Sequence, residues 1–187
     1  MITRAIVYAV EKHGHQFRKG HIRLQRLPYV VHPIRVLNTI WRWGTTETVQ
    51  VAAVLHDVLE DTNATYADIK DLFGKEVADI VFQLTFDPNN GTKEEYLASF
   101  KNKDTTSLII KIADRLDNVI DYLAVGNGQY AKKYFEKAAV VFETFRERIN
   151  INSELVEQSC QNYQSALQEI EHLESHLRLS LNVLTNS

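Results

Sequence analysis

The segment His56-Asp57-Val58-Leu59-Glu60-Asp61 places an imidazole and three carboxyl groups beside a run of apolar residues. The apolar positions between Val49 and Leu59 predict a buried helix. Polar groups on the inner side of such a helix cost free energy unless a partner satisfies them. A divalent metal ion would do so, and imidazole with carboxylate suits Mn, Fe, Zn or Co better than Ca or Mg alone.

The spacing divides these residues into two pairs. His56 and Glu60 are four residues apart and would share one helix face, as would Asp57 and Asp61. The first residues of the segment could therefore hold an ion, while those a turn further along the helix face a substrate.

A complete metal site needs more ligands, and the sequence offers two candidates. His32 precedes Pro33 at the start of an apolar helical segment, and Asp114 lies inside another such segment. Taken alone, His32 could cap a turn, and Asp114 could form an ion pair with Lys111 or Arg115. Taken together, in this order and each beside an apolar helix, four residues favour a metal site: His32, His56, Asp57 and Asp114.

The composition is that of an ordinary globular protein. Of the 187 residues, 44% are hydrophobic and 24% are charged, which predicts a single core with at most an appendage. No apolar run approaches the length of a membrane span, and the first residues lack the layout of a signal peptide. The single Cys160 excludes an internal disulfide and fits a reducing compartment. We therefore expect a cytoplasmic protein that does not bind membranes.

Positive charge is concentrated near the beginning of the chain, although the net charge is -3. Residues 1–44 contain eight Lys and Arg residues against one acidic residue, Glu11. A basic region next to a metal site indicates a small polyanionic substrate, such as a phosphorylated nucleotide. A solvated basic face is the alternative. We do not expect nucleic-acid binding, because no nucleic-acid module is recognisable.

The hydrophobic pattern predicts an all-α protein. After a first helix around Ala5–His13 and a loop over 17–31, helices are expected at about 33–43, 47–59, 75–85, 93–102, 105–124 and 130–149. Thr65 with Asp68 predicts a capped helix that ends near Gly74. A small β-hairpin around 84–92 is the one alternative to helix.

The end of the chain carries a separate amphipathic pattern. Over 152–182, apolar residues form a near-heptad stripe that must be buried somewhere. The segment could fold back on the core, which we favour, or it could pair with a second subunit to give a homo-oligomer. We accordingly divide the chain into a domain over 1–150 and a C-terminal helical extension over 151–187.

Several segments, taken in order, resemble the hydrolase domain of RelA/SpoT proteins, which belongs to the HD phosphohydrolase superfamily. The similarity covers roughly residues 3–149, and the Glu60-Asp61-Thr62 extension after His56-Asp57 is its most specific feature. The other segments are Phe17-Arg18-Lys19-Gly20, Pro28-Tyr29-Val30-Val31-His32-Pro33, Phe73-Gly74, Lys111-Ile112-Ala113-Asp114-Arg115-Leu116-Asp117-Asn118, and Tyr134-Phe135-Glu136-Lys137-Ala138-Ala139, which is similar to the metazoan SpoT homologs.

This resemblance implies an HD-domain helical bundle with one Mn²⁺ per chain, other divalent transition metals being the alternative. It also implies a stand-alone small alarmone hydrolase that removes the 3′-diphosphate of ppGpp and pppGpp. By the same resemblance, His32, His56, Asp57 and Asp114 are metal ligands, and Glu60 and Asp61 are catalytic. Substrate contacts are implied for three further residues: Arg18, Lys19 and Asn118.

The sequence departs from the family pattern at several positions, including Gly20 and Asp117, a position that often holds Tyr or His. Such departures leave the substrate open. The same metal site could act on a deoxynucleoside triphosphate, a nucleoside monophosphate or NADPH. A non-enzymatic nucleotide-binding module is the third hypothesis, but the presence of every ligand type and of the Glu60-Asp61 pair argues against it.

Overall fold

The computed structural model describes residues 1–18, 27–124 and 126–185, with side chains described as far as residue 177. Helices joined by short turns make up these segments, and they contain no β-strand. The one β-type contact among them is an isolated antiparallel bridge between Phe17 and Pro28. The predicted all-α fold is therefore confirmed.

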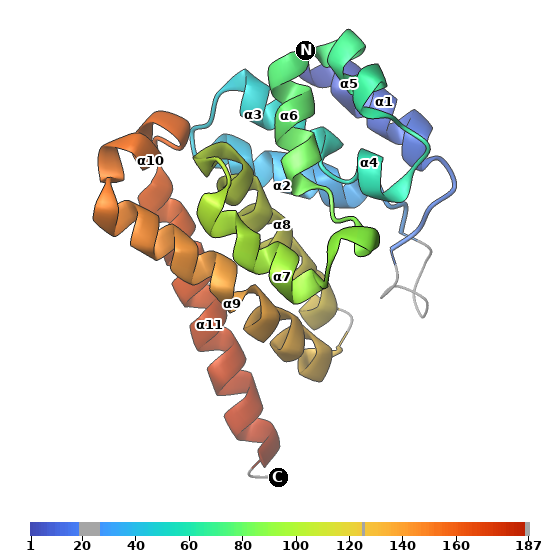
Figure 1. Ribbon diagram of the computed structural model, residues 1–187. Helices are drawn as coiled ribbons and strands as arrows, with labels where there is room; N and C mark the ends of the chain where they lie inside the picture. Colours follow the sequence, from blue (N-terminus) through green and yellow to red (C-terminus); the bar gives the residue numbers. More distant parts are fainter. Residues whose placement is uncertain (19–26, 125, 186–187) are drawn as a thin grey trace.

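The described helices follow one another along the chain with few long connections (Figure 1). Their bounds are α1 Ile2–His13, α2 Val31–Arg42, α3 Glu47–Leu55, α4 Val58–Asp61, α5 Tyr66–Phe73, α6 Lys75–Leu84, the 3₁₀ helix η1 Pro88–Asn90, α7 Lys93–Ala98, the 3₁₀ helix η2 Ser99–Asn102, α8 Thr105–Ala124, α9 Gly128–Ile151, α10 Ser153–Ser159 and α11 Tyr163–Thr185.

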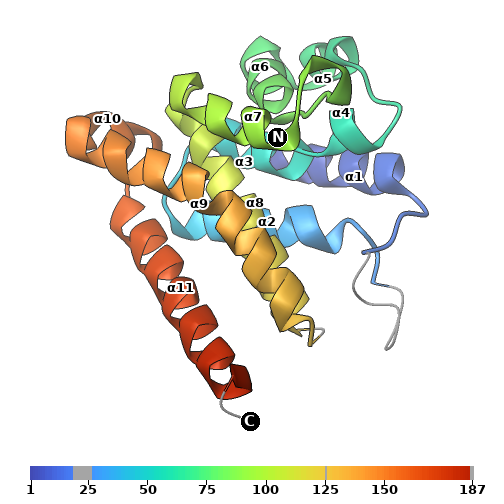
Figure 2. The ribbon, with the colours of Figure 1, turned by 60° about the horizontal axis from the view of Figure 1, so that its bottom comes forward.

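Helix α8 forms the centre of the bundle. All of its residues from Ser107 to Val119 are buried, which is the pattern of a helix that is surrounded on every side. It packs against α2, α3, α6, α9 and α10. Figure 1 shows it running behind α7, and both ribbon views show it beside α9 (Figures 1 and 2). Polar residues on α8 therefore lie deep inside the molecule.

The predicted helix cap after α4 is present. The Thr65 hydroxyl accepts a hydrogen bond from the Asp68 amide, and the Asp68 carboxylate accepts one from the Thr65 amide. Gly74 ends α5 with a φ of 94°, a conformation that glycine adopts without steric cost. This local sequence pattern alone fixes both ends of α5.

The single helix predicted over 47–59 is wrong in one respect, because it is interrupted at His56 and Asp57. His56 Nδ1 lies 2.8 Å from the carbonyl oxygen of Ala53. In an uninterrupted helix that oxygen would accept the amide of Asp57. The imidazole thus competes with the helix backbone, and Asp57 adopts φ −101° and ψ −5° before α4 begins.

Two other predicted elements differ in detail. The segment 93–102 is an α-helix followed by a 3₁₀ turn, α7 and η2, and not one helix. The suggested hairpin over 84–92 is wrong, because its centre is the 3₁₀ helix η1. Asp87 accepts a hydrogen bond from the Asn89 amide there, and this local bond favours a turn over an extended strand.

The C-terminal segment folds back onto the body of the protein. Val156, Ile170 and Leu177 are buried in the same hydrophobic cluster as the rest of the core, and α11 packs against α9. The segment is two helices and not one, because a break at Cys160 separates α10 from α11. At this break the Asn162 amide donates to the carbonyl of Trp43, just after α2.

None of the helices described is long and apolar enough to cross a membrane.

We predict that Ile170→Ala lowers the free energy of unfolding by about 2–4 kcal/mol, because it leaves a cavity where α11 meets the core. Ile170 is fully buried, whereas its neighbour Glu171 is exposed. Glu171→Ala is therefore the matched control, with an expected change within about 0.5 kcal/mol. Urea titration of both variants measures the difference. Equal stability of the two variants would show that α11 does not contribute to the core.

Candidate active site

Four of the predicted site residues converge from three regions of the chain. His32 Nε2 lies 3.2 Å from Asp114 Oδ1 and 3.6 Å from Asp57 Oδ2. His56 Nε2 lies 3.0 Å from Asp57 Oδ2 and 3.8 Å from Asp114 Oδ1. His32, His56 and Asp57 form a group that could hold a metal ion, since one ligand atom of each lies within 4.8 Å of the others.

These four residues are brought together by the packing of the elements that carry them. His32 is in the first turn of α2, Asp114 is in the middle of the buried helix α8, and His56 and Asp57 form the break between α3 and α4. Helix α2 packs against both α3 and α8. The three elements therefore bring their polar residues to one point inside the bundle.

Hydrogen bonds fix the orientation of both imidazole rings. His56 Nδ1 is bonded to the carbonyl of Ala53, and His32 Nδ1 lies 2.6 Å from Asp117 Oδ2. A carbonyl and a carboxylate only accept, so Nδ1 is the donor in both rings. The Nε2 atom of each ring then faces the carboxylates of Asp57 and Asp114, which are called the acidic cluster below. His56 Nε2 is buried with no hydrogen-bond partner among the described residues. This donor set fits a divalent transition metal.

The carboxyl groups of the cluster are held in their ionised form. Burial would raise the pKa of Asp114, but Lys111, His32 and Arg115 outweigh it and hold that pKa well below its usual value. Burial likewise opposes ionisation of Asp57, yet His56 and His32 lower its pKa. Burial would lower the pKa of His32, but bonds to Asp114 and Asp117 raise it to about 9. A divalent ion would compete with that proton for the same carboxylates.

Lys111 is an almost fully buried cation beside this cluster. Its Nζ lies 2.8 Å from Asp114 Oδ2, and its side chain is 3% exposed. Burial alone would lower the pKa of Lys111, but the neighbouring acidic groups, above all Asp114, raise it. The ion pair considered from the sequence therefore exists, and the other oxygen of Asp114 is the one that faces His32.

Glu60 and Asp61 lie on α4, directly after the break, and both are exposed. The Glu60 carboxylate accepts a hydrogen bond from the Phe86 amide at 2.9 Å and pairs with Lys93 Nζ at 3.1 Å. Partial burial of the Asp61 carboxyl and the charge of Asp57 raise the pKa of that carboxyl. Both carboxyl groups therefore border the acidic cluster without belonging to it.

Several supporting residues were missed from the sequence, although one of them, Tyr29, lies in a quoted motif. The hydroxyl of Tyr29 donates to Asp57 Oδ2 at 2.5 Å, and burial raises the pKa of this hydroxyl, so that it stays a donor. Gln16 donates to the carbonyl oxygen of Asp61 at 2.6 Å. Pro28-Tyr29 could have drawn attention to Tyr29, whereas no sequence signal pointed to Gln16.

Two of the three predicted substrate contacts, Arg18 and Asn118, lie among the described residues. Arg18 donates from Nε to Asp121 at 2.9 Å and from Nη2 to Asn118 at 2.7 Å. Asn118 in turn donates to the Asp114 carboxylate at 2.6 Å. Arg18 and Asn118 are thus adjacent to the acidic cluster, while Lys19 lies outside the described residues.

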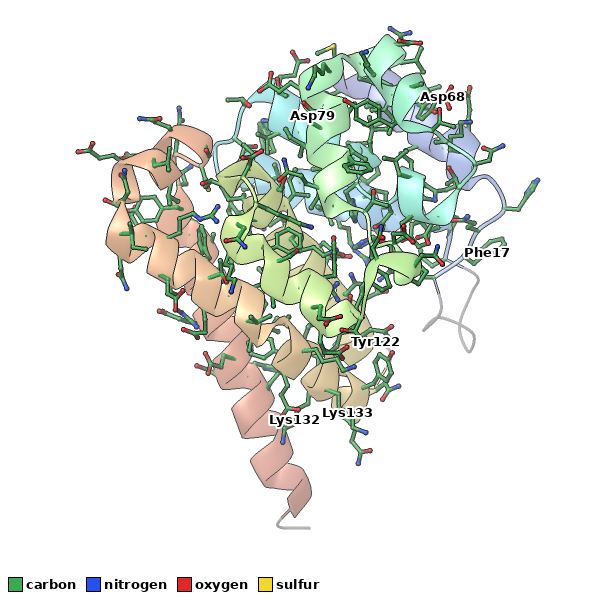
Figure 3. All side chains as sticks on the ribbon, viewed as in Figure 1. Phe17, Asp68, Asp79, Tyr122, Lys132 and Lys133 are labelled. Carbon is green, nitrogen blue, oxygen red and sulfur yellow. The ribbon has the colours of Figure 1, made fainter. Side chains whose placement is uncertain are left out.

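A cavity of about 630 Å³ opens onto these residues. It is lined by His32, Asp57, Glu60, Asp61 and Asp114, by Arg18, Lys93, Lys111, Arg115 and Lys137, and by Tyr29, Tyr122, Tyr130 and Tyr134 among others. Figure 3 labels two positions on its lining, Phe17 after α1 and Tyr122 near the end of α8. Acidic, basic and aromatic side chains therefore surround one space large enough for a nucleotide.

Comparison with known protein families shows which family this helical chain belongs to. Residues 5–152 match the model of the HD domain. This chain belongs to the HD domain family. Its His56-Asp57 pair and its all-α bundle agree with that membership.

Named relatives of this HD domain occur in bacteria and animals. The chain is 33% identical to guanosine-3′,5′-bis(diphosphate) 3′-pyrophosphohydrolase of Aquifex aeolicus over 80% of its own length and 22% of that protein. It is 32% identical to the Xenopus tropicalis enzyme of the same name, MESH1, over 78% of its own length and 85% of that protein. It therefore spans about a fifth of the bacterial relative and most of the animal one.

A solved structure shares the arrangement of this HD domain. The match has a TM-score of 0.73 at 27% sequence identity and covers 94% of each chain. That structure is of a metazoan ortholog of SpoT described as hydrolysing ppGpp. The similarity extends over nearly the whole chain, the C-terminal segment included.

We predict that Lys111→Met lowers the free energy of unfolding of the metal-free HD domain by about 3–5 kcal/mol, because it leaves Asp114 buried without its cation. Lys75→Met is the matched control, since Lys75 also pairs with an aspartate one turn away but is 72% exposed. Its expected loss is at most about 0.5 kcal/mol. Urea titration in EDTA measures both, and equal small losses would contradict the prediction.

Proposed function

We propose that this HD domain hydrolyses the 3′-diphosphate of the guanosine alarmones ppGpp and pppGpp, releasing pyrophosphate with GDP or GTP. The observation that carries the proposal is the convergence of four ligand-type side chains beside Glu60 and Asp61, in a chain similar to named pyrophosphohydrolases. In this reaction water adds to the phosphorus that bears the 3′ oxygen. The bond between this phosphorus and the 3′ oxygen breaks, and the 3′ oxygen takes up a proton as pyrophosphate is released.

We assign His32, His56, Asp57 and Asp114 as the ligands of one divalent ion, with Mn²⁺ as the first candidate. Such an ion would lower the pKa of a bound water and neutralise charge on a phosphoryl oxygen. The two imidazoles and two carboxylates are the donor types that favour transition metals. Hydrogen bonds to the outer nitrogen of each imidazole support the assignment, because oriented ligands hold metal more tightly.

We assign Glu60 and Asp61 as the catalytic pair. Glu60 is the residue to which we assign the proton of the attacking water. The Glu60 carboxylate borders the ligand cluster and is held by Lys93 and the Phe86 amide, which keeps an acceptor at a fixed position. A carboxylate so held can take the proton of the attacking water. The backbone of Asp61 is fixed in turn by Gln16.

Basic residues in the cavity suit the phosphate groups of the substrate. Lys93, Lys111 and Arg115 line the cavity, as do Arg18 and Asn118. Lys binds phosphate as a point charge and Arg by a fork of donors. Tyr130, which is 48% exposed, offers an aromatic face on which a base could stack.

We predict that the purified protein with Mn²⁺ releases pyrophosphate and GDP from ppGpp in equal amounts, and that EDTA abolishes this activity. The measurement is chromatography of the products, with dNTPs, nucleoside monophosphates and NADPH tested in parallel. If the protein is inert toward ppGpp but turns over another of these nucleotides, the proposed substrate is wrong and that nucleotide is the substrate of the site.

We predict that His56→Ala removes metal and activity together, because the site itself is weakened. Glu60→Gln should keep its metal while turnover falls about 100-fold or more, the usual scale for a general acid or base. Metal content after gel filtration and the rate of pyrophosphate release distinguish the two variants. His172→Ala, on the exposed side of α11, is the control. Loss of metal from Glu60→Gln would refute the separation of roles.

A further inference from the structure

We propose that Arg35 is a positioning residue that holds Asp117 and Asp121 together, so that the first orients His32 for the metal and the second orients Arg18 for the substrate. These three residues, Arg35, Asp117 and Asp121, are called the Arg35 bridge below. The proposal rests on the proposed function in two respects, the assignment of His32 as a metal ligand and of Arg18 as a substrate contact.

The first arm of the bridge reaches His32. Asp117 Oδ2 accepts a hydrogen bond from His32 Nδ1 at 2.6 Å. With Nδ1 donating to Asp117, the ring directs Nε2 toward Asp57 and Asp114, and loss of the Nε2 proton would leave a lone pair there for a metal ion. Asp117 therefore decides both the tautomer and the direction of a ring that is 1% exposed.

Arg35 holds Asp117 with a planar, two-point contact. Its Nε lies 2.6 Å from Asp117 Oδ1 and its Nη2 lies 3.0 Å from Asp117 Oδ2. Such a fork fixes the plane of the carboxylate as well as its distance. Arg35 is one turn after His32 on α2, so the same helix carries the ligand and the cation that orients it.

The second arm of the bridge reaches Arg18. The same Nη2 of Arg35 donates to Asp121 Oδ1 at 2.8 Å, and Asp121 Oδ2 accepts from Arg18 Nε at 2.9 Å. Asp117 and Asp121 are one turn apart on α8, and their side chains are 9% and 7% exposed. Two carboxylates so close repel each other, and Arg35 contacts both.

The contacts form a closed circuit around the site. Arg18 donates to Asn118, Asn118 donates to Asp114, and Asp114 faces His32. The Arg35 bridge connects the two ends of this series, His32 and Arg18, and so closes the circuit. Arg35 is 36% exposed and does not itself line the cavity. A substitution of Arg35 should nevertheless change the orientation of His32, the proposed metal ligand.

The test is Arg35→Gln, compared with Arg42→Gln as a matched control from the same helix. Arg42 is 50% exposed and pairs with Glu169. Calorimetric titration of the metal-stripped full chain with Mn²⁺ should give a Kd about 10–100-fold weaker for Arg35→Gln, the usual cost of losing such a support. Arg42→Gln should bind Mn²⁺ as the unchanged protein does.

A second readout follows His32 without metal or substrate. Imidazole ¹⁵N spectra of the metal-free protein should show a protonated, hydrogen-bonded Nδ1 for His32, and Arg35→Gln should shift that signal while leaving the signals of His172 and His176 in place. Arg35→Lys keeps the charge but not the fork, so its Mn²⁺ affinity should be intermediate. This milder variant decides the question if Arg35→Gln does not fold.

Wild-type Mn²⁺ affinity and an unchanged His32 signal in Arg35→Gln or Arg35→Lys would overturn the proposal, as would equal losses in Arg35→Gln and Arg42→Gln. A wild-type protein that binds Mn²⁺ but does not hydrolyse ppGpp would refute the proposed substrate alone. A wild-type protein that binds no divalent ion would overturn both.

Discussion

The structure depends on compensating the negative charge that is buried where α2, α8 and the α3–α4 break meet. Asp57 and Asp114 are surrounded by a bundle whose other buried residues are largely apolar, and an isolated carboxylate there would cost several kcal/mol. Two imidazoles, a buried lysine and a tyrosine hydroxyl contact these two groups. Such compensation keeps the carboxylates ionised, which is the form that a metal ion binds.

The sequence predicted those features of the fold and the site that depend on local pattern. The apolar period of α8, the Thr65 cap and the order of His32, His56, Asp57 and Asp114 were all readable from residue spacing. The break between α3 and α4 was not, because it arises when the His56 side chain takes a carbonyl that the backbone would otherwise use. Local propensity contains no information about that competition.

The supporting contacts were beyond prediction for a different reason. Arg35 meets Asp117 across 82 residues of sequence, and Lys93 meets Glu60 across 33. Nothing near either residue indicates its partner, since a charged residue on a helix is most often a solvated one. Asp117 was noticed as a departure from the family pattern, but its contact with His32 follows only from the packing of α2 on α8.

Helix α2 is restrained at both of its ends. Its first turn carries His32, and just beyond its last turn the Trp43 carbonyl accepts the Asn162 amide while the Trp43 indole donates to Glu169. A helix tied at one end alone can fray from the other, whereas one tied at both opens only when a larger unit unfolds. The backbone amides of α2 should therefore exchange with solvent deuterium nearly as slowly as those of α8, although α2 lies nearer the surface.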